Sequence, residues 1–557
     1  MKNYTQLFIG LFITLSFPII AHAQTTLIKN VKGYTLADDN LVEFVAIQFT
    51  DDKIDRLFVE NEPLPQSNEF NVINGQGKTL IPGLIDAHGH VLSYGLSLLR
   101  ADLVGTTSEQ EAVKRVQNYA KNNKSLLWIQ GQGWNQVQWD SNQFPSATSL
   151  DKYFPDTPVW LRRIDGHAGW ANSKAMQLAG ISKDTLSPAG GEIIKNASGE
   201  PNGVFIDNAM SLIDDAIAPL TLAEQKSTLV MAMTSLASMG LTSVHDAGIS
   251  KLNINAYKEL SKSNKMPIRV NAMLDITDEN WRQILAQGKY KSDDDKFVLH
   301  SVKISADGAL GSRGAALIED YSDKPGHKGL LLHDQQSLAN YMKTSMEAGF
   351  QVNTHAIGDN ANNIVLNNYE QLIAQTNTKA LRHRIEHAQI LKLSDIPRFN
   401  HLKVIASMQA THATSDKNMA QARLGEERIL GAYAWRKLIN AKAIIAAGSD
   451  FPVESANPFY GLHASITRQD HQNQPQDGWF PQEKMTRIEA FKSFTIDAAY
   501  SGHQESIIGS LSTGKKADFV LLEDNIFTIA ESKLWQNKVL ATWVNGKKVY
   551  TDANTTL

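Results

Sequence analysis

Two histidines, His88 and His90, stand two positions apart at the end of an apolar run. The stretch Ile81-Pro-Gly-Leu-Ile-Asp-Ala-His-Gly-His90 is typical of a buried β-strand. Residues two apart on a strand point to the same face, so both imidazoles would project in one direction. Imidazole is a common protein ligand for divalent transition metals, and the pair could form half of a metal site. This stretch alone fits a pair of surface or hydrogen-bonding histidines equally well.

Further residues that could take part in a metal site follow later strand-like runs. They are Lys303, His355, His387 and Asp450, the last in Ala447-Gly-Ser-Asp-Phe-Pro452. Divalent metals of hydrolytic enzymes take nitrogen and oxygen ligands, which the four imidazoles and the carboxylate would provide. An ammonium cannot bind a cation, but a lysine converted to its carbamate would carry an anionic group able to bridge two metals. The alternatives for Lys303 are an ion pair with Asp307 and an outward-facing charge.

These residues need a scaffold that brings several strand ends to one place. Most of the later strand-like runs are followed by helical sequence, and strands alternating with helices imply parallel pairing. Together with the strand ending at His90 they number eight, as in a (β/α)8 barrel, whose chemistry lies at the C-terminal strand ends. We therefore predict an α/β fold with a TIM-type barrel over residues 81–499. The later strands are expected at 241–245, 268–273, 300–304, 351–355, 382–387, 404–408 and 443–447.

Additional segments flank and interrupt the predicted barrel. Short β-rich runs precede it and follow it, and Asn545-Gly546 between two of them is a strong hairpin signal. Because chain termini often lie close together, we expect residues 24–80 and 500–557 to form a small composite β-sandwich domain. Residues from about 105 to 235 exceed any ordinary crossover connection. They predict a large insertion after the first barrel strand, lying over the barrel mouth.

Composition excludes several classes of function. The chain has 557 residues, 42% hydrophobic and 20% charged, which is ordinary globular composition. Its net charge of −4 argues against a nucleic-acid partner. There are no cysteines, so disulfides and thiolate metal ligands are excluded. We expect a small-molecule substrate, and a homodimer is left open.

The first 23 residues are typical of an export signal. Lys2 supplies a positive start, residues 7–20 are mostly apolar, and Ala21-His-Ala23 fits the small-x-small cleavage pattern. The apolar run is shorter than the roughly 20 residues that a membrane span needs. We therefore predict a mature protein that begins at Gln24, lies in the periplasm or outside the cell, and has no stable membrane anchor.

The ordered set Pro82–His90, Lys303, His355, His387 and Asp450 resembles the amidohydrolase superfamily. The tail Ile508–Leu522 also resembles the small β domain that follows the barrel in that superfamily. A narrower resemblance is to the YtcJ-like branch, which includes N-substituted formamide deformylase. It is carried by Gly166-His-Ala-Gly-Trp-Ala-Asn-Ser173, Lys303-Ile-Ser-Ala-Asp-Gly-Ala-Leu-Gly-Ser-Arg313 and Arg382-His-Arg-Ile-Glu-His387.

This resemblance implies a binuclear metal site, expected to hold two Zn²⁺, although some members of the superfamily work with one metal. His88, His90 and Asp450 would hold the deeper metal, His355 and His387 the outer one, and a carboxylated Lys303 would bridge them. Two such metals lower the pKa of a shared water and polarise the substrate's carbonyl. Asp450 would act as general base and then as general acid.

We therefore expect an exported metal-dependent amidohydrolase that cleaves a carbon–nitrogen bond of the amide type. One alternative is an ester, lactone or phosphoester hydrolase, because the same activated water attacks these electrophiles. The other is a non-catalytic binding or regulatory protein on the same scaffold.

Three residues outside the ligand set are candidate substrate contacts. The resemblance makes His167 a candidate catalytic residue touching the scissile group, and the alternative is a turn cap. Trp134 could line an apolar pocket or belong to a core. Arg313 could bind a carboxylate through its bidentate fork or pair with Asp307. Glu386 points to the opposite face from His387 by strand alternation and is not expected to be a ligand.

Overall fold

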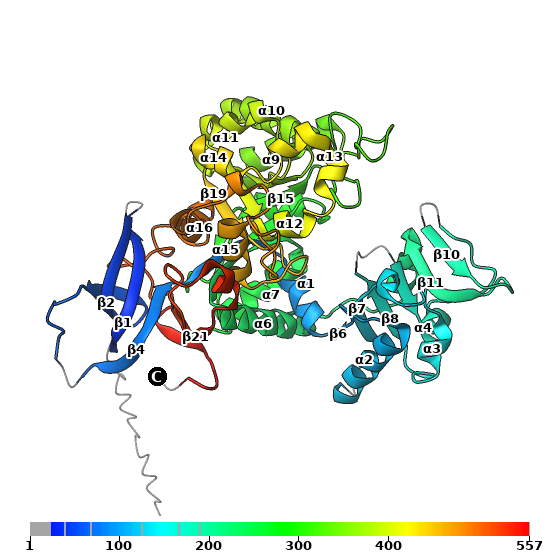
Figure 1. Ribbon diagram of the computed structural model, residues 1–557, viewed down its shortest axis with the longest axis horizontal. Coiled ribbons are helices and arrows are strands. Elements are labelled where there is room, and N and C mark those ends of the chain that lie inside the picture. Colours follow the sequence, from blue (N-terminus) through cyan, green and yellow to red (C-terminus); the bar gives the residue numbers. More distant parts are fainter. Residues whose placement is uncertain are drawn as a thin grey trace, which may run out of the picture.

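The computed structural model describes residues 24–37, 40–66, 69–123, 126–164, 168–188 and 191–555. Figure 1 shows three parts next to one another: a sheet that holds both ends of the described chain, a central barrel, and a separate lobe. The predicted export signal, residues 1–23, and the candidate residue His167 lie outside the described residues. Across the described ranges, every helix is too short or too polar to cross a membrane.

The central part is a nearly closed barrel of eight parallel strands, as the sequence predicts. Consecutive strands pair in parallel register, and nearly all of their residues are buried, as expected for strands covered on both faces. A two-residue strand, β14 (Tyr290–Lys291), pairs antiparallel with β15. The eight barrel strands are β5 (Leu84–Gly89), β12 (Leu241–Ile249), β13 (Arg269–Asp275), β15 (Phe297–Ser305), β16 (Gln351–Ala356), β17 (Arg384–His387), β18 (Ile405–Gln409) and β19 (Ile445–Gly448).

Helices in the connections bury their apolar faces toward the barrel. In α10 (Asp359–Thr376), the buried residues Ala361, Val365 and Leu372 lie on one face of the helix. Helix α6 begins with a capping box, in which Thr221 and Glu224 bond each other's backbone N–H groups. The other barrel helices are α1 (Val91–Leu98), α6 (Leu222–Ser238), α7 (Lys251–Lys262), α8 (Trp281–Gln287), α9 (Gln335–Glu347), α11 (Ile396–Leu402), α12 (Ala410–Asp416), α13 (Ala420–Arg428), α14 (Trp435–Asn440), α15 (Pro458–Thr467), α16 (Arg487–Ser493) and α17 (Ile496–Ser501).

The barrel closes where β19 meets β5. The Asp450 N–H donates to the His88 carbonyl at 2.7 Å, and the His90 N–H donates to the Phe451 carbonyl at 2.8 Å. The buried Asp86 carboxylate accepts the Ser449 hydroxyl at 2.7 Å and the Ser449 N–H at 3.1 Å. These bonds bring the residue after β19 beside the histidines of β5.

Gly448 makes this close approach of the two strands feasible. A Cβ atom at Gly448 would lie 2.6 Å from the His88 nitrogen and 2.7 Å from an Asp86 carboxylate oxygen. Real Cβ atoms essentially never approach that closely, and one of the two obstacles is backbone. The position therefore requires glycine.

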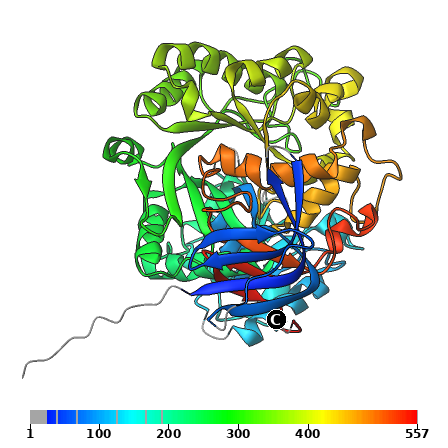
Figure 2. The same cartoon turned by 90° about the vertical axis from the view of Figure 1, so that its left-hand side faces the viewer.

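A seven-stranded sheet joins the two ends of the described chain, in the order β22-β21-β20-β4-β1-β2-β3. Phe49 of β2 packs against Phe519 of β20 with ring centroids 5.5 Å apart, although β4 and β1 lie between them in the strand order. The sheet therefore folds back on itself as a sandwich, and Figure 2 shows its N-terminal strands in blue in front of its C-terminal strands in red. Its strands are β1 (Thr25–Ala37), β2 (Asn40–Thr50), β3 (Lys53–Phe58), β4 (Asn71–Pro82), β20 (Phe519–Leu522), β21 (Val539–Val544) and β22 (Lys547–Thr551).

Two features attach this composite sheet to the barrel. Strand β4 ends at Pro82 and β5 begins at Leu84, so the chain passes from the sheet into the barrel almost without a break. Arg269, the first residue of β13, forms a buried bidentate ion pair with Asp518 at 2.7 and 3.1 Å. A buried pair of this kind is costly to break from one side, so it fixes the sheet against the barrel.

The insertion is a lobe with a core of its own. Trp134, Trp139 and Trp170 pack together there with aliphatic residues of its sheet. The sheet order is β10-β11-β9-β8-β7-β6. Its elements are β6 (Ala101–Asp102), α2 (Glu109–Asn122), β7 (Ile129–Trp134), α3 (Ala147–Asp151), β8 (Val159–Arg163), β9 (Ala168–Ala171), α4 (Ser173–Leu178), β10 (Gly191–Lys195), β11 (Pro201–Asp207) and α5 (Ser211–Asp214).

The lobe differs from its predicted extent. Figure 1 shows it next to α1, on the side of the barrel away from the composite sheet. It buries its apolar side chains internally, so its core does not depend on covering the strand ends. The lobe ends after α5, before the predicted limit at about 235, because α6 packs against α1 and β12 of the barrel.

Gly448→Ala should destabilise the protein, because its methyl group would collide with the β5 backbone. We expect a loss of about 1–3 kcal/mol, the usual cost of overpacking a rigid core. Urea unfolding of the two proteins measures the difference. Gly311→Ala is the matched control, since its Cβ would lie at an ordinary 3.7 Å from the Met419 methyl group. Equal stability of Gly448→Ala and wild type would contradict the close-approach argument.

Candidate metal centre

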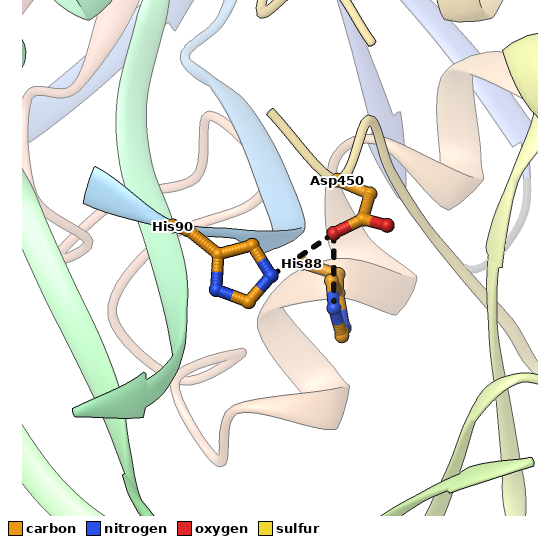
Figure 3. A group of neighbouring side chains, drawn as sticks. All are labelled: His88, His90 and Asp450. Carbon is orange, nitrogen blue, oxygen red and sulfur yellow. Dashed lines mark ion pairs between the residues drawn. The ribbon is translucent and has the colours of Figure 1, made fainter. Parts of the chain in front are cut away.

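Three side chains converge where β5 and β19 end. The His90 Nε2 lies 3.1 Å from Asp450 Oδ1, and the His88 Nε2 lies 3.5 Å from the same oxygen. Figure 3 shows both rings pointing toward the carboxylate. His88 and Asp450 are buried, whereas the His90 side chain is 33% exposed. The two-residue spacing thus brings two imidazole nitrogens to one carboxylate oxygen.

Two further histidines lie beside this group. His355 is the last but one residue of β16 and His387 is the last of β17, with ring centroids 4.5 Å apart. The His387 ring lies 4.8 Å from that of His88. The His387 Nδ1 is 2.7 Å from the Gln409 amide oxygen. Because an amide oxygen can only accept, His387 donates from Nδ1 and keeps its Nε2 lone pair free.

Lys303, on β15, lies in the same cluster. Its Nζ is 3.3 Å from the His88 Nε2, and the side chain is buried. The alternative ion pair with Asp307 is wrong, because Asp307 accepts backbone N–H groups of Ala316, Ile357 and Gly358. Burial lowers the pKa of Lys303 below its usual value.

Glu386 contacts the centre in a way that the sequence analysis missed. Its buried carboxylate accepts a hydrogen bond from the His88 Nδ1 and pairs with Arg384 at 2.8 Å. Strand alternation would separate Glu386 from His387, but the φ angle of His387 is +72°, so the extended conformation ends there. Both side chains therefore face the cluster, and Glu386 holds the His88 ring with Nε2 toward Asp450.

His412 is a second residue that the sequence analysis missed. It lies in α12, which begins directly after β18, and its Nε2 is 3.7 Å from Asp450 Oδ2. Its ring lies nearly parallel to that of His387, with 22° between the planes and 5.9 Å between centroids. A lone histidine in a helix carries no strand-end signal. Its position three residues after the end of β18 was the one sequence feature that could have placed it near the site.

The local environment sets these groups in the protonation states that metal ligands require. Burial lowers the pKa of His88 to about 4 and that of His355 to about 3, and it holds the pKa of His387 well below its usual value. Burial alone would raise the pKa of Asp450, but the neighbouring imidazoles of His90, His88 and His387 hold it well below its usual range. At neutral pH these three imidazoles are therefore neutral and Asp450 is a carboxylate, as metal binding requires.

Unpaired polar atoms test whether a cation fits here. Within the described residues, the buried His355 Nε2, His412 Nε2 and Asp450 Oδ1 have no hydrogen-bond partner. Buried polar atoms are normally paired, so three unpaired ones at one place are typical of a cation site. Two groups have ligand atoms that all lie within 4.8 Å of one another: His88, His90 and Asp450, and His387, His412 and Asp450. His355 belongs to neither group, and its Nε2 lies 3.5 Å from Asp307.

The described candidate substrate contacts lie elsewhere. Trp134 is completely buried in the lobe, and its indole N–H donates to the Leu161 carbonyl at 2.8 Å. It is a core residue, which corrects its interpretation as a pocket wall. The Arg313 guanidinium donates to Asp323, and not to Asp307, at 2.8 and 3.1 Å. This salt bridge already occupies the groups that would bind a substrate carboxylate.

Comparisons with known proteins agree with this geometry. A sequence model described as "Amidohydrolase family" matches residues 71–550. The chain is 36% identical to "Protein LONG AFTER FAR-RED 3" of Arabidopsis thaliana over 86% of this chain and 83% of that protein. It is 33% identical to "Putative amidohydrolase YtcJ" of Bacillus subtilis (strain 168), covering 87% and 91%. It is 25% identical to "N-substituted formamide deformylase" of Arthrobacter pascens, covering 86% and 89%.

A solved structure supports the fold. The crystal structure of an uncharacterized metal-dependent hydrolase from Pyrococcus horikoshii OT3 superposes with a TM-score of 0.75. The match covers 91% of this chain and 99% of that one, at 23% sequence identity. The expected resemblance to the YtcJ-like branch of the amidohydrolases is thereby confirmed.

Glu386→Gln should weaken metal binding, because a neutral amide holds the His88 ring less firmly and leaves the buried Arg384 charge unpaired. Loss of such an outer partner costs about 10–100-fold in metal affinity. Competition with a chelator gives the affinity for Zn²⁺. Glu505→Gln is the control, since Glu505 also pairs with an arginine, Arg382, but away from the cluster. Unchanged zinc affinity in Glu386→Gln would refute the positioning role.

Proposed function

The chain belongs to the amidohydrolase family, and from this we propose that it is an exported hydrolase that uses divalent metal to cleave a carbon–nitrogen bond of the amide type. Metal-dependent hydrolysis follows from the family and the cluster of histidine and aspartate ligands. The carbon–nitrogen bond and export are the finer parts of the proposal. The names of two relatives, "Putative amidohydrolase YtcJ" and "N-substituted formamide deformylase", support the carbon–nitrogen bond. The sequence of residues 1–23 supports export.

One observation carries the proposal: His88, His90 and Asp450 meet at the C-terminal end of the barrel. Two imidazole nitrogens lie 3.1 and 3.5 Å from one carboxylate oxygen, in a largely buried setting. Nitrogen and oxygen donors of this kind suit Zn²⁺. Active sites of TIM-type barrels lie at this end of the strands.

The other residues of the cluster would complete a binuclear centre. His355 and His387 would hold an outer cation, and Lys303 would bridge the two cations once its amine is carboxylated. The buried position of Lys303 beside His88 supports this role. A bound divalent cation lowers the pKa of water and polarises a carbonyl oxygen.

Asp450 would carry the proton during the reaction. It is ionised at neutral pH, so it can accept a proton from the attacking water. It would then deliver that proton to the leaving nitrogen, which otherwise departs as a poor anionic leaving group. Glu386 and Gln409 would keep the rings of His88 and His387 fixed while this happens, because each accepts an Nδ1–H.

Substitution of the central residues tests the proposal. His88→Ala should lose bound metal, and Asp450→Asn should lose activity by about 10²–10⁴-fold, because its amide cannot accept the proton. Metal analysis and the hydrolysis of a panel of N-acyl and formamide compounds measure the two effects. His401→Ala removes an exposed histidine and serves as control. Unchanged metal content and unchanged hydrolysis in both variants would exclude the proposed function.

The choice of bond has its own test. Amide and ester analogues that share one acyl group should be compared as substrates of the wild-type protein. We expect turnover of the amide together with dependence on Asp450, since the leaving amine needs protonation more than an alkoxide does. Turnover of the ester alone would move the assignment to an ester or lactone hydrolase.

Lys303→Ala should lose both metal and activity if a carboxylated lysine bridges the cations. Short carboxylic acids should then restore part of the activity, because their two oxygens can take the place of the carbamate. Metal content and hydrolysis with and without added acid are the measurements. If Lys303→Ala kept both metals and full turnover, the bridge would be wrong.

A further inference from the structure

Asp450 presents its two oxygens to two different sets of histidines. Oδ1 lies 3.1 Å from the His90 Nε2 and 3.5 Å from the His88 Nε2. Oδ2 faces the other way and lies 3.7 Å from the His412 Nε2. One carboxylate is therefore positioned to contribute an oxygen to each of two neighbouring sites.

His412 is held firmly on the side of Oδ2. The helix that carries it, α12, is tied to the segment after β19 by a hydrogen bond of 2.6 Å from the Ser415 hydroxyl to Glu454. At its end, Asp416 accepts the Tyr433 hydroxyl at 2.6 Å, and Lys417 pairs with Asp470 at 2.8 Å. The first contact joins α12 to the segment that presents Asp450, and the other two attach the end of α12 to neighbouring loops, so the histidine is positioned by the structure around it.

The ring of His412 lacks the partners of a structural histidine. His383 provides the comparison: its Nδ1 accepts the Val352 N–H at 3.0 Å, and its Nε2 bonds the Thr378 hydroxyl at 3.2 Å. The His412 Nε2, by contrast, has no hydrogen-bond partner among the described residues, although its side chain is only 12% exposed. An unpaired, nearly buried imidazole nitrogen that points at a carboxylate is placed to bind a cation together with that carboxylate.

His387 is oriented to join the same site. Gln409, the last residue of β18, accepts its Nδ1–H and leaves Nε2 free. The rings of His387 and His412 lie nearly parallel, and their ligand atoms and that of Asp450 lie within 4.8 Å of one another. Two imidazoles and one carboxylate are the usual protein ligands of a catalytic zinc site, which keeps one position open.

We propose that His412 is a ligand of the outer cation, which it holds together with His387 and the Oδ2 of Asp450. This rests on the proposed function, in which the cluster holds divalent metal. The sequence-based ligand set contains no residue from β18 or its following helix, and His412 adds one. Asp450 then joins the two cations through its two oxygens, so the outer cation does not depend on Lys303 alone.

The test uses the metal-free full-length mature protein, titrated with Zn²⁺ and with Co²⁺ while heat and visible absorption are followed. His412→Gln and His412→Ala should still bind the tighter equivalent of metal as the wild type does. They should bind the weaker equivalent at least about tenfold less tightly, since even the loss of a residue that only supports a metal ligand costs that much. The Co²⁺ absorption that belongs to the weaker equivalent should change as well. His401→Gln, an exposed histidine, is the control. Thermal unfolding of the metal-free variants checks that both are folded.

The outcomes separate this inference from the function on which it rests. Wild-type affinity for both equivalents in both variants would overturn the role of His412 and leave the proposed function intact. A raised KM with unchanged metal binding would also overturn it, because His412 would then contact substrate instead. The role of His412 would also be overturned if the wild-type protein bound only one equivalent of metal and both variants bound it with unchanged affinity. A wild-type protein that binds no divalent metal would remove both proposals.

Discussion

The whole centre depends on how closely β19 approaches β5. Two backbone hydrogen bonds and the Asp86–Ser449 contact hold the strands together, and Gly448 leaves the space for that contact. Because the bonds involve the backbone of His88 and Asp450 themselves, closing the barrel and assembling the ligands are one event. The position of a carboxylate between two imidazoles is thus set by main-chain geometry, which a change of side chain elsewhere can hardly disturb.

Around this contact, the protein fixes two of the histidine rings through the nitrogen that faces away from the cation site. Glu386 holds His88, and Gln409 holds His387. The two acceptors differ in charge, since one is a carboxylate paired with Arg384 and the other is a neutral amide. A charged acceptor makes its imidazole a stronger donor to metal than a neutral one does. His88 and His387 therefore offer ring nitrogens of different donor strength.

The sequence predicts the barrel well because its signals are local: an apolar run, a polar residue at its end, and a helix after it. His88, His90, His355, His387 and Asp450 all follow such runs, so their meeting at one end of the barrel could be expected. The contacts of Glu386 and His412 with the centre were not predicted, for physical reasons. The positive φ of His387 breaks the alternation that was assumed for Glu386, and His412 reaches the centre from a helix. The end of the lobe was also predicted too late, because α6 is helical sequence like the helices of the lobe but packs against the barrel.

The contact between Asp86 and Ser449 joins residues 363 positions apart in the chain. Contacts of such long range form late, because the intervening chain must first lose most of its freedom. A nascent or unfolded chain therefore has isolated histidines without the carboxylate that completes their site. If the protein leaves the cytoplasm unfolded, it would collect its cations only at its destination, and the metal supply of that compartment would decide which ion it holds.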